Sequence, residues 1–574
     1  MKRESIKNKK IILYGDERYI RDFLYVFDDI VPAYYVNDEI DGYAEHWEKI
    51  KEETLEDIMV IVCKYDELQA SSNLRSIGLE RGKNFISAEV CFEWLDFPIT
   101  QISKSRDVYV WGAGEDGDHF FRNYLSKHGE IHIVGVIDSD PNKAGKSFFG
   151  RTIYLPEDII SSKNAFIIIA TKKYYNDVRK MLESAGMKNR EDFISFVGIN
   201  QYASEMMKRT IYDVPKIDFL CEKPFKALEL KPEGRILICG GMNETYVKVD
   251  PMYYSDFTDI WSSSVLKVIR LSCVNGTYTF CNPQICCYIR ESGISDIDVD
   301  DYKYLKEKTE GQLQYLRKKK RHSKNTVLNR SNYEKREEKY PKTVQMGFDE
   351  SCNLHCPSCR KEVRFADSDK LIELDKFKKR VYEEIIGNIS KIKLAGQGEA
   401  FASSIYREML FDEELAKSVG SIGILSNGSL FTPEMFDKLS TIWKNIDVFI
   451  SMDGASKETA EKLRAGVNFE KWKNNMEYLG EMRRIGKIGK LAFNFVVQRS
   501  NYLEMPDYAS MCLGFHADCI KFSMLGNWGN WSKEEFDRIS MFDENGEMKH
   551  ELIEVVNSEI FLRPEVFLFR WVDW

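Results

Sequence analysis

Three cysteines in one short stretch offer the chemistry around which the rest of the chain can be interpreted. Cys352, Cys356 and Cys359 are spaced C-x3-C-x2-C and follow the apolar run 344–348. Three thiolates on one loop can face a single metal centre and would leave a four-iron cluster with one iron that no protein atom occupies. That iron is open to a ligand with its own nitrogen and oxygen donors. The alternatives are a zinc site, for which His355 is a poorly placed fourth ligand, or three buried thiols.

Alternating strand and helix patterns follow the cysteines. Apolar runs begin near residues 391, 421, 446, 490 and 519, and with the run before Cys352 they predict six βα units. Ligands collect at the carboxyl ends of parallel strands, so the residues directly after these runs are candidates for binding. These candidates are Gly396, Gln397, Gly398 and Glu399 after the second run, Ser426 and Asn427 after the third, Ser451 after the fourth, and Arg464 one helix further on.

The cysteine spacing and the strand-end residues together resemble the radical S-adenosylmethionine (radical SAM) enzymes over residues 342–526. The resemblance implies a partial (β/α)6 barrel, a 4Fe-4S cluster on the three cysteines, and S-adenosylmethionine at the open iron. It also implies that the loop 396–400 with Glu399 meets the amino group of S-adenosylmethionine, Ser451 its ribose and Arg464 its carboxylate. The family's G-G-E-P motif is altered here, because Gln397 and Ala400 replace a glycine and the proline.

The same resemblance implies a reductive reaction. S-adenosylmethionine would be cleaved, and the 5′-deoxyadenosyl radical would remove hydrogen from an unactivated C–H bond. The electron would come from a donor such as flavodoxin or ferredoxin. The outcome would be oxidation, or epimerisation if Cys512 or Cys519 returned a hydrogen atom, although both cysteines also fit as buried apolar residues.

A second group of cysteines lies within residues 214–300. Residues 228–230 and 235–238 predict a hairpin, which would bring the flanking cysteines to one ligand site. The segment resembles the SPASM or twitch extension of radical SAM enzymes, although it precedes the cysteine triplet and has too few cysteines for two clusters. The resemblance implies a small cysteine-rich α+β domain with one auxiliary 4Fe-4S cluster, and structural zinc is the alternative. The ligands would be Cys221, Cys239, Cys281 and either Cys286 or Cys287.

Residues 1–100 and 101–205 each alternate apolar strands with amphipathic helices, which predicts two Rossmann-like domains. The first has lost the later glycines of its phosphate loop, so it does not favour pyrophosphate binding. In the second, the fingerprint glycines and the acid that closes the next strand predict a nucleotide or nucleotide-sugar site. These residues are Gly112, Gly114, Gly117 and Asp138. Glu115 and Asp116 would repel phosphate and favour the alternative, docking or homodimerisation.

Composition and the remaining segments set limits on this α/β protein. The net charge of -9 argues against a general nucleic-acid binder, which needs an excess of Lys and Arg. No apolar run approaches the roughly 20 residues of a membrane helix, and no signal-peptide core follows the start, so we expect a cytoplasmic protein. Residues 301–338 predict a charged helical linker, 339–530 the barrel, and 531–574 a segment that closes the barrel or adds an edge strand.

Three functions remain open from the sequence. The Rossmann-like pair resembles modules attached to bacterial carbohydrate-modifying enzymes and favours a carbohydrate or nucleotide-linked small molecule as substrate. The SPASM-like segment taken alone favours a peptide maturase, although no winged-helix-like segment for peptide recognition is evident. A non-catalytic iron-sulfur scaffold is the third reading, and the intact cysteine triplet with its strand-end residues disfavours it.

Overall fold

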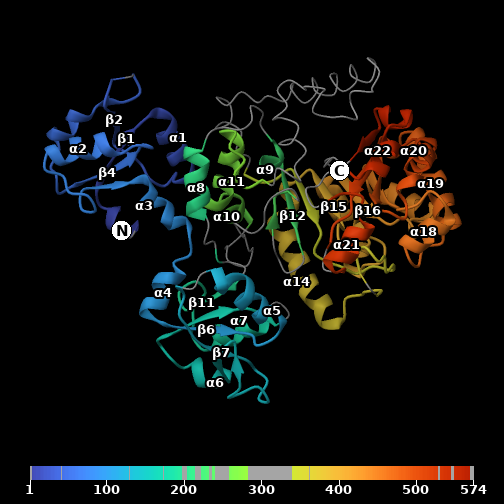
Figure 1. The fold of residues 1–574 in the computed structure, drawn as a ribbon, viewed down its shortest axis with the longest axis horizontal. Coiled ribbons are helices and arrows are strands. Elements are labelled where there is room, and N and C mark those ends of the chain that lie inside the picture. Colours follow the sequence, from blue (N-terminus) through green and yellow to red (C-terminus); the bar gives the residue numbers. More distant parts are fainter. Residues whose placement is uncertain are drawn as a thin grey trace. The chain divides into compact units, whose positions relative to one another are not determined.

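The chain is an α/β protein with three sheets made mostly of parallel strands (Figure 1). The structure, a computed structural model, describes residues 3–40, 42–127, 130–171, 174–196, 199, 203–213, 221–231, 236–239, 257–281, 339–360, 362–527, 530–543 and 548–568. Two compact units divide the chain, residues 1–215 with 243–280, and residues 216–242 with 281–574. In the described ranges, no helix is long and apolar enough to cross a membrane.

The first sheet is parallel throughout, with the strand order β3-β2-β1-β4-β5. Its strands are β1 Lys10–Gly15, β2 Tyr34–Asn37, β3 Glu45–His46, β4 Ile58–Cys63 and β5 Phe85–Ser87, and its helices are α1 Glu17–Val26, α2 Leu68–Ser76 and α3 Ala88–Phe92. Every residue of β4 is buried, as expected for a parallel strand covered on both faces. The chain leaves β1 toward β2 and returns on the other side to β4, so the strand order reverses between β1 and β4.

The second sheet has the order β11-β10-β6-β7-β9-β8, and only the β8–β9 pair is antiparallel. Its strands are β6 Asp107–Trp111, β7 Ile133–Ile137, β8 Ser147–Phe148, β9 Arg151–Tyr154, β10 Ala165–Ile169 and β11 Phe193–Ser195. Helices α4 Ile99–Ser105, α5 Glu115–His119, α6 Pro156–Ile159 and α7 Tyr175–Ser184 accompany them. Fully buried Val108, Val110, Phe166 and Ile168 form the centre of one core layer.

Helices α8 Ala203–Tyr212, α10 Phe257–Trp261 and α11 Ser264–Val274 complete the first unit. Helix α11 packs against α1 and α8, and all its residues from Val265 to Cys273 are buried. A helix that is apolar on most sides is stable only when other elements cover it. The segment 214–300, expected as one cysteine-rich domain, is therefore divided in the structure, because residues 257–280 belong to the first unit and the hairpin to the second.

The third sheet has nine strands in the order β13-β12-β14-β15-β16-β17-β18-β19-β20. They are β12 Ala227–Leu230, β13 Ile236–Leu237, β14 Thr343–Met346, β15 Lys391–Leu394, β16 Ser421–Ser426, β17 Asn445–Ser451, β18 Lys490–Val497, β19 Cys519–Met524 and β20 Val566–Leu568. The expected hairpin exists as the antiparallel pair β12–β13, but β12 also pairs in parallel with β14. The hairpin thus extends the large sheet and covers the backbone groups of β14, which would otherwise be an open edge.

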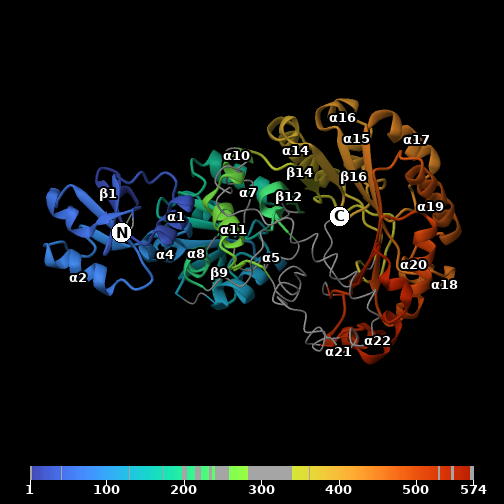
Figure 2. The ribbon, with the colours of Figure 1, turned by 90° about the horizontal axis from the view of Figure 1, so that it is seen from above.

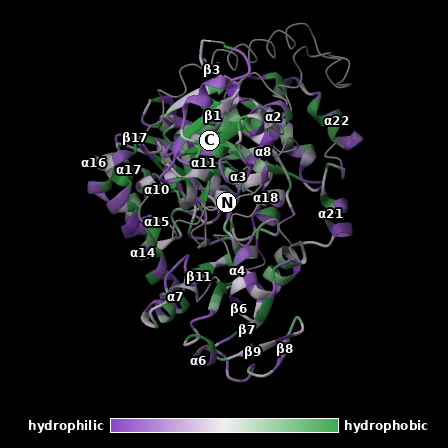
Figure 3. Cartoon of the chain, turned by 90° about the vertical axis from the view of Figure 1, so that its left-hand side faces the viewer, coloured by the Kyte–Doolittle hydropathy of each residue, from purple (hydrophilic) through white to green (hydrophobic). Residues whose placement is uncertain are grey.

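Ten helices accompany the third sheet in the described part of the second unit. They are α9 Lys223–Lys226, α14 Ser368–Glu384, α15 Ser404–Leu410, α16 Glu413–Val419, α17 Pro433–Ile442, α18 Lys457–Leu463, α19 Phe469–Arg484, α20 Met505–Gly514, α21 Lys533–Ile539 and α22 His550–Val556. The helices from α14 to α20 follow the outer side of the curved sheet (Figure 2). Outer helices such as α16 and α21 are largely hydrophilic, whereas central strands such as β1 in the first unit are hydrophobic (Figure 3).

Candidate functional site

The cysteine triplet lies on the loop that follows β14, at the carboxyl edge of the third sheet. The Cys352 N–H donates to the Arg364 carbonyl at 2.7 Å, and the Cys359 N–H donates to the Cys356 carbonyl at 2.9 Å. Cys356 is buried, Cys352 is half-buried and Cys359 is exposed. The loop is thus held by its own backbone hydrogen bonds and presents thiols at three depths.

Each sulfur has N–H donors or a cation nearby. The Leu354 N–H lies 3.5 Å from Cys352 Sγ, and Arg360 Nη2 lies 3.5 Å from Cys359 Sγ. Burial raises the pKa of the Cys352 thiol, whereas the Leu354 N–H and Arg360 lower it. Burial also raises the pKa of Cys356, and the Arg464 guanidinium opposes that rise. For Cys352 and Cys356 these neighbours offset part of the effect of burial, although the pKa of both thiols stays raised. The thiolate is the form that binds metals.

The chemistry of the donor set is compatible with a four-iron cluster. Among the described residues, no three His, Cys, Asp or Glu side chains lie close enough to hold a metal ion. In a four-iron cluster each thiolate binds a different iron, so the three sulfurs need not converge on one point. Three thiols on one loop, with N–H donors and guanidinium groups around them, suit that cluster and leave its fourth iron open.

Two glycines after β15 bring their loop against the cysteine loop. A Cβ on Gly398 would lie 2.5 Å from the Asp349 carbonyl oxygen and 2.7 Å from that of Ser351. Gly396 has a φ of +154°, and a Cβ there would lie 2.6 Å from Gln345 Nε2. Gly398 is therefore required by close backbone packing against the cysteine loop, and Gly396 is favoured by its positive φ.

Arg360, which the sequence analysis did not single out, joins these two loops. Its Nη1 donates to the Glu350 carbonyl at 2.6 Å, and its Nη2 donates to the Gln397 carbonyl and to Cys359 Sγ. An arginine directly after the last cysteine was the only available signal. The five N–H groups of a guanidinium can hold several carbonyls in one geometry, which an ammonium group cannot reproduce.

Glu399 is buried and bonded to the neighbouring loop. Its Oε1 accepts from Ser426 Oγ at 2.8 Å and from the Phe401 N–H at 3.2 Å, and its Oε2 accepts from the Asn427 N–H at 2.6 Å. Burial raises the pKa of this carboxyl, while these hydrogen bonds favour its charged form. Glu399 thus joins the loop after β15 to the end of β16. Contact with the amino group of S-adenosylmethionine would have to add to these bonds.

Asn427 links the end of β16 to the first cysteine. Its Nδ2 donates to Asn353 Oδ1 at 3.0 Å and lies 3.9 Å from Cys352 Sγ. Asn353 in turn donates to Ser429 Oγ at 3.0 Å. Asn353 was also missed from the sequence, where its place directly after Cys352 was the signal. The result is a polar network between the cysteine loop and the β16 loop.

Arg464 reaches the site as part of a buried ion pair. Its Nε lies 2.7 Å from Asp453 Oδ2, and the Asp453 side chain is fully buried. Burial works against the charge of Arg464, but Asp453 and the thiol of Cys356 raise its pKa above the ordinary value. The His355 N–H donates to the Ala465 carbonyl at 3.1 Å, so the turn that carries Arg464 is attached to the cysteine loop.

For the other expected ligand residues, the structure shows the strand or helix beside which each described one lies. Ser451 ends β17, where it is in register with Asn494 of β18. Cys221 precedes α9, Cys239 follows β13 and Cys281 is the last residue before a long undescribed stretch. Cys286, Cys287 and the linker 301–338 lie outside the described residues. The auxiliary cluster therefore stays a prediction.

The second sheet uses its fingerprint residues for internal packing. Gly112 has a φ of +128°, and a Cβ on Gly117 would lie 1.9 Å from the Gly112 carbonyl oxygen, whereas one on Gly114 would meet nothing within 4 Å. Asp138 Oδ2 accepts from the Ala113 N–H and from Lys143 Nζ, both at 2.9 Å. The acid expected to bind a ribose is thus bonded to the glycine loop itself, and the nucleotide site stays a prediction.

Comparisons with known proteins give one family and several distant structures. The family model C2185-like, N-terminal, matches residues 104–192, which is the region of the second sheet. Among solved structures, Streptococcus suis SuiB bound to the precursor peptide SuiA is 16% identical over 40% of this chain and 49% of that chain, with a TM-score of 0.29. This chain therefore spans about half the length of SuiB. No curated protein matches the sequence.

Two further structures are methyltransferases. A radical SAM methyltransferase from Sphaerobacter thermophilus is 15% identical over 40% of this chain and 64% of that chain, with a TM-score of 0.25. The radical SAM methyltransferase TsrM from Kitasatospora setae, with cobalamin and a [4Fe-4S] cluster bound, is 10% identical over 90% of this chain and 72% of that chain, with a TM-score of 0.27. These are distant structural similarities to radical SAM enzymes.

Proposed function

We propose that this chain is a radical SAM enzyme and that strands β14 to β19 form the partial (β/α)6 barrel of that family. Cys352, Cys356 and Cys359 would hold the 4Fe-4S cluster and leave one iron for S-adenosylmethionine. When bound, the reduced cluster would supply the electron that cleaves S-adenosylmethionine to methionine and a 5′-deoxyadenosyl radical. This radical would take a hydrogen atom from a substrate C–H bond. The reductant would be an electron donor of the flavodoxin or ferredoxin type.

The residues of the chain orient and enclose this chemistry. Arg360 fixes the cysteine loop against the Gln397 carbonyl, and Glu399 fixes the β15 loop against the β16 loop. Arg464 would use its terminal nitrogens to bind the carboxylate of S-adenosylmethionine while Asp453 holds its Nε. Ser451 at the end of β17 would face the ribose hydroxyls. The binding groups then sit on rigid strand ends around the open iron.

The observation that most supports this proposal is the joining of two strand-end loops and the turn after α18 to the cysteine loop. Arg360 bonds the β15 loop, Asn427 bonds the β16 loop, and His355 bonds the turn that carries Arg464. Three ordinary buried thiols would not need polar contacts from three separate segments of the sheet's carboxyl edge. A site that must hold a cofactor in a fixed position does need them.

Iron and sulfide per chain, measured after anaerobic reconstitution together with 5′-deoxyadenosine formation, test the proposal. We expect the Cys352→Ala, Cys356→Ala, Cys359→Ala triple variant to lose about four irons and all 5′-deoxyadenosine formation, since a cluster of this kind is held by cysteine thiolates. Cys63→Ala, a change to a buried cysteine of β4, is the control and should keep both. An unchanged iron content in the triple variant would contradict the proposal.

For the substrate, we propose a carbohydrate or nucleotide-linked small molecule that is oxidised or epimerised. The retained glycine loop and closing acid of the second sheet support this choice. Nucleotide sugars deuterated at single positions, incubated with the reduced enzyme and S-adenosylmethionine, would reveal the abstracted hydrogen as deuterium in 5′-deoxyadenosine. Transfer from one position is expected. Absence of transfer from every sugar, with 5′-deoxyadenosine still formed, would favour a peptide substrate.

The positions of two cysteines favour oxidation over epimerisation. Cys512 lies in α20 and is fully buried beside Tyr508, which packs on the helix-covered face of the sheet. Cys519 is on the opposite face, in a row with Phe449 and Ala492, but it is the first residue of β19 and so lies at the amino edge. Neither thiol is at the carboxyl edge where the radical would form, so Cys519→Ala should leave the product unchanged.

A further inference from the structure

The carboxyl edge of the first sheet carries a polar cluster that the proposed function does not use. The strand order reverses between β1 and β4, and the reversal point of a parallel sheet is where ligands bind. At this point the two strand ends touch, since a Cβ on Gly15 would lie 2.0 Å from the Cys63 carbonyl oxygen. Asp16, Asp38 and Lys64 directly follow β1, β2 and β4.

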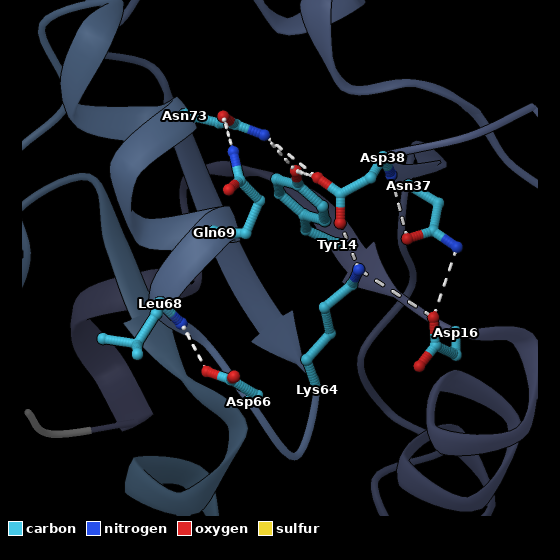
Figure 4. Close-up of polar contacts among 9 residues, drawn as sticks. All are labelled: Tyr14, Asp16, Asn37, Asp38, Lys64, Asp66, Leu68, Gln69 and Asn73. Atoms are coloured by element: carbon cyan, nitrogen blue, oxygen red, sulfur yellow. Dashed lines mark hydrogen bonds and ion pairs between the residues drawn. The ribbon is translucent and has the colours of Figure 1, made fainter.

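Asp38 is the centre of this cluster (Figure 4). Its Oδ1 accepts from Tyr14 Oη and from Asn73 Nδ2, the latter at 3.0 Å, and its Oδ2 accepts from Lys64 Nζ. Burial raises the pKa of Asp38, but Lys64 and Tyr14 outweigh it and hold the pKa below its ordinary value. The cluster therefore contains an ionised carboxylate and an ammonium group whose positions are fixed by β1, β4 and α2.

Asp16 leaves part of the hydrogen-bonding capacity of the cluster accessible, whereas only 14% of the Lys64 side chain is exposed. The Lys64 ammonium lies between the carboxylates of Asp38 and Asp16 (Figure 4), but Asp16 Oδ1 is 3.9 Å away, beyond hydrogen-bond distance. A ligand hydroxyl can bridge this gap by accepting from Lys64 and donating to Asp16. The Asp16 side chain is 53% exposed, and although Asp16 precedes α1, it makes no capping bond to that helix. Asp16 is thus oriented toward Lys64 and Asn37 instead of toward its own helix.

Large apolar side chains follow the same strand ends. Ile40 in the loop after β2 is 75% exposed, Tyr65 after β4 is 73% exposed, and Leu68 at the start of α2 is 80% exposed. Tyr65 directly follows Lys64 in the chain, so its exposed ring is available for contact with the apolar face of a ligand. An aromatic ring beside carboxylate, amide and ammonium groups suits a molecule with one apolar face and several hydroxyls.

We propose that this edge binds the vicinal hydroxyls of a sugar, free or as the ribose of a nucleoside, between Asp16 and Lys64, with the apolar face of the ligand against Tyr65. The ligand would be neutral at this position, because two carboxylates oppose a phosphate and the loop after β1 lacks the glycines that would admit one. This inference goes beyond the proposed function, because it needs neither iron nor S-adenosylmethionine.

Titration calorimetry of the full chain with uridine and with methyl glucoside tests the proposal and distinguishes a nucleoside from a free sugar. We expect one of the two to bind, and 2′,3′-dideoxyuridine, which lacks both ribose hydroxyls, not to bind. Lys64→Met and Asp16→Asn should each weaken binding about tenfold, the cost of one hydrogen bond to a charged group. Lys143→Met, the matched change beside Asp138 in the second sheet, should leave the affinity unchanged.

Asp16→Asn keeps the test decisive if Lys64→Met lowers stability, because the Asp16 side chain is exposed and its loss disturbs little packing. Three results would overturn the proposal. The first is no binding of either probe at millimolar concentration. The second is binding that survives Asp16→Asn or that dideoxyuridine shares. The third is binding that Lys143→Met abolishes, which would place the ligand on the second sheet.

Discussion

Arg360 shows how one side chain can set the geometry of the cysteine loop. Its guanidinium contacts two backbone carbonyls and one sulfur on two separate loops. The charge of the sulfur matters as well, since the Cys359 thiolate raises the pKa of Arg360 against the effect of burial. The neighbouring Arg364 is different, because its side chain is 58% exposed and bonds only the Glu350 carboxylate among the described contacts.

Arg360→Lys is expected to destabilise the second unit and to reduce iron incorporation. A lysine keeps the charge but loses the fixed fork of donors, so about 1–3 kcal/mol of unfolding free energy should be lost. The melting temperature of the chain and the iron content after reconstitution measure the two effects. Arg364→Lys should change stability by less than about 1 kcal/mol, as is usual for a surface ion pair. Equal effects of the two changes would show that Arg360 has no special positioning role.

The hydrogen bonds of the Asp518 carboxylate are expected to stabilise the folded state in a pH-dependent way. Its carboxylate is bonded to Arg483 of α19 by two contacts of 2.6 Å and accepts from the Leu491 N–H of β18 at 2.8 Å. Burial raises the pKa of Asp518, but Arg483 and the Leu491 N–H outweigh it and hold the pKa below 3.8. A lowered pKa in the folded state means that this stabilisation is present above pH 3.8 and is lost as the pH falls through the folded pKa.

Asp518→Asn should therefore cost about 1 kcal/mol at pH 7, a value reduced by partial exposure, and progressively less below pH 3.8. Urea unfolding of both proteins between pH 7 and pH 3 measures the difference. Glu481→Gln, which removes an exposed partner of Arg484, is the control and should leave the urea midpoint unchanged. A cost that does not vary with pH would contradict the assignment of the ionised form.

At the scale of elements, the close approach of the β15 loop to the cysteine loop depends on the absence of a side chain at Gly398. The Gly398 position lies against backbone oxygens of the cysteine loop, which cannot move aside as a flexible side chain would. Gly398→Ala should displace the cysteine loop, with loss of iron and a lower melting temperature. Gly387→Ala, where a Cβ would meet nothing within 4 Å, is the matched control and should be neutral. Iron retained at the wild-type level in Gly398→Ala would show that the loops need not touch.

The sequence predicted the strands of the third sheet better than it predicted which strands pair and which side chains bond to one another. Strands β14 to β19 follow the expected apolar runs, because a buried parallel strand is recognisable from its own residues. The pairing of β12 with β14 joins residues more than 100 positions apart, and no local pattern encodes it. For the same reason the sequence suggested that Glu399 would lie near the site, but not that its partners would be Ser426 and Asn427.

At the scale of the whole molecule, the chain passes between the two compact units more than once. Residues 216–242 join the second unit before 243–280 return to the first. Each unit nevertheless has its own sheets and its own buried residues, and β12 is hydrogen-bonded to β14 within the second unit. Units with separate cores can unfold separately, which breaks two-state behaviour and gives each unit its own transition.

Calorimetry of the reconstituted chain should therefore show two transitions, and each proposed ligand should shift a different one. A ligand that binds only the folded state raises stability by RT ln(1 + [L]/Kd), about 2.7 kcal/mol at a hundredfold excess over Kd. S-adenosylmethionine should raise the transition of the second unit, and the bound nucleoside or sugar should raise that of the first. At the same ligand concentration, Lys64→Met should reduce only the shift with the nucleoside or sugar, from about 2.7 to about 1.4 kcal/mol for a tenfold weaker Kd. The triple cysteine variant should abolish only the shift with S-adenosylmethionine. A single transition that either ligand moves would mean that the two units unfold as one body.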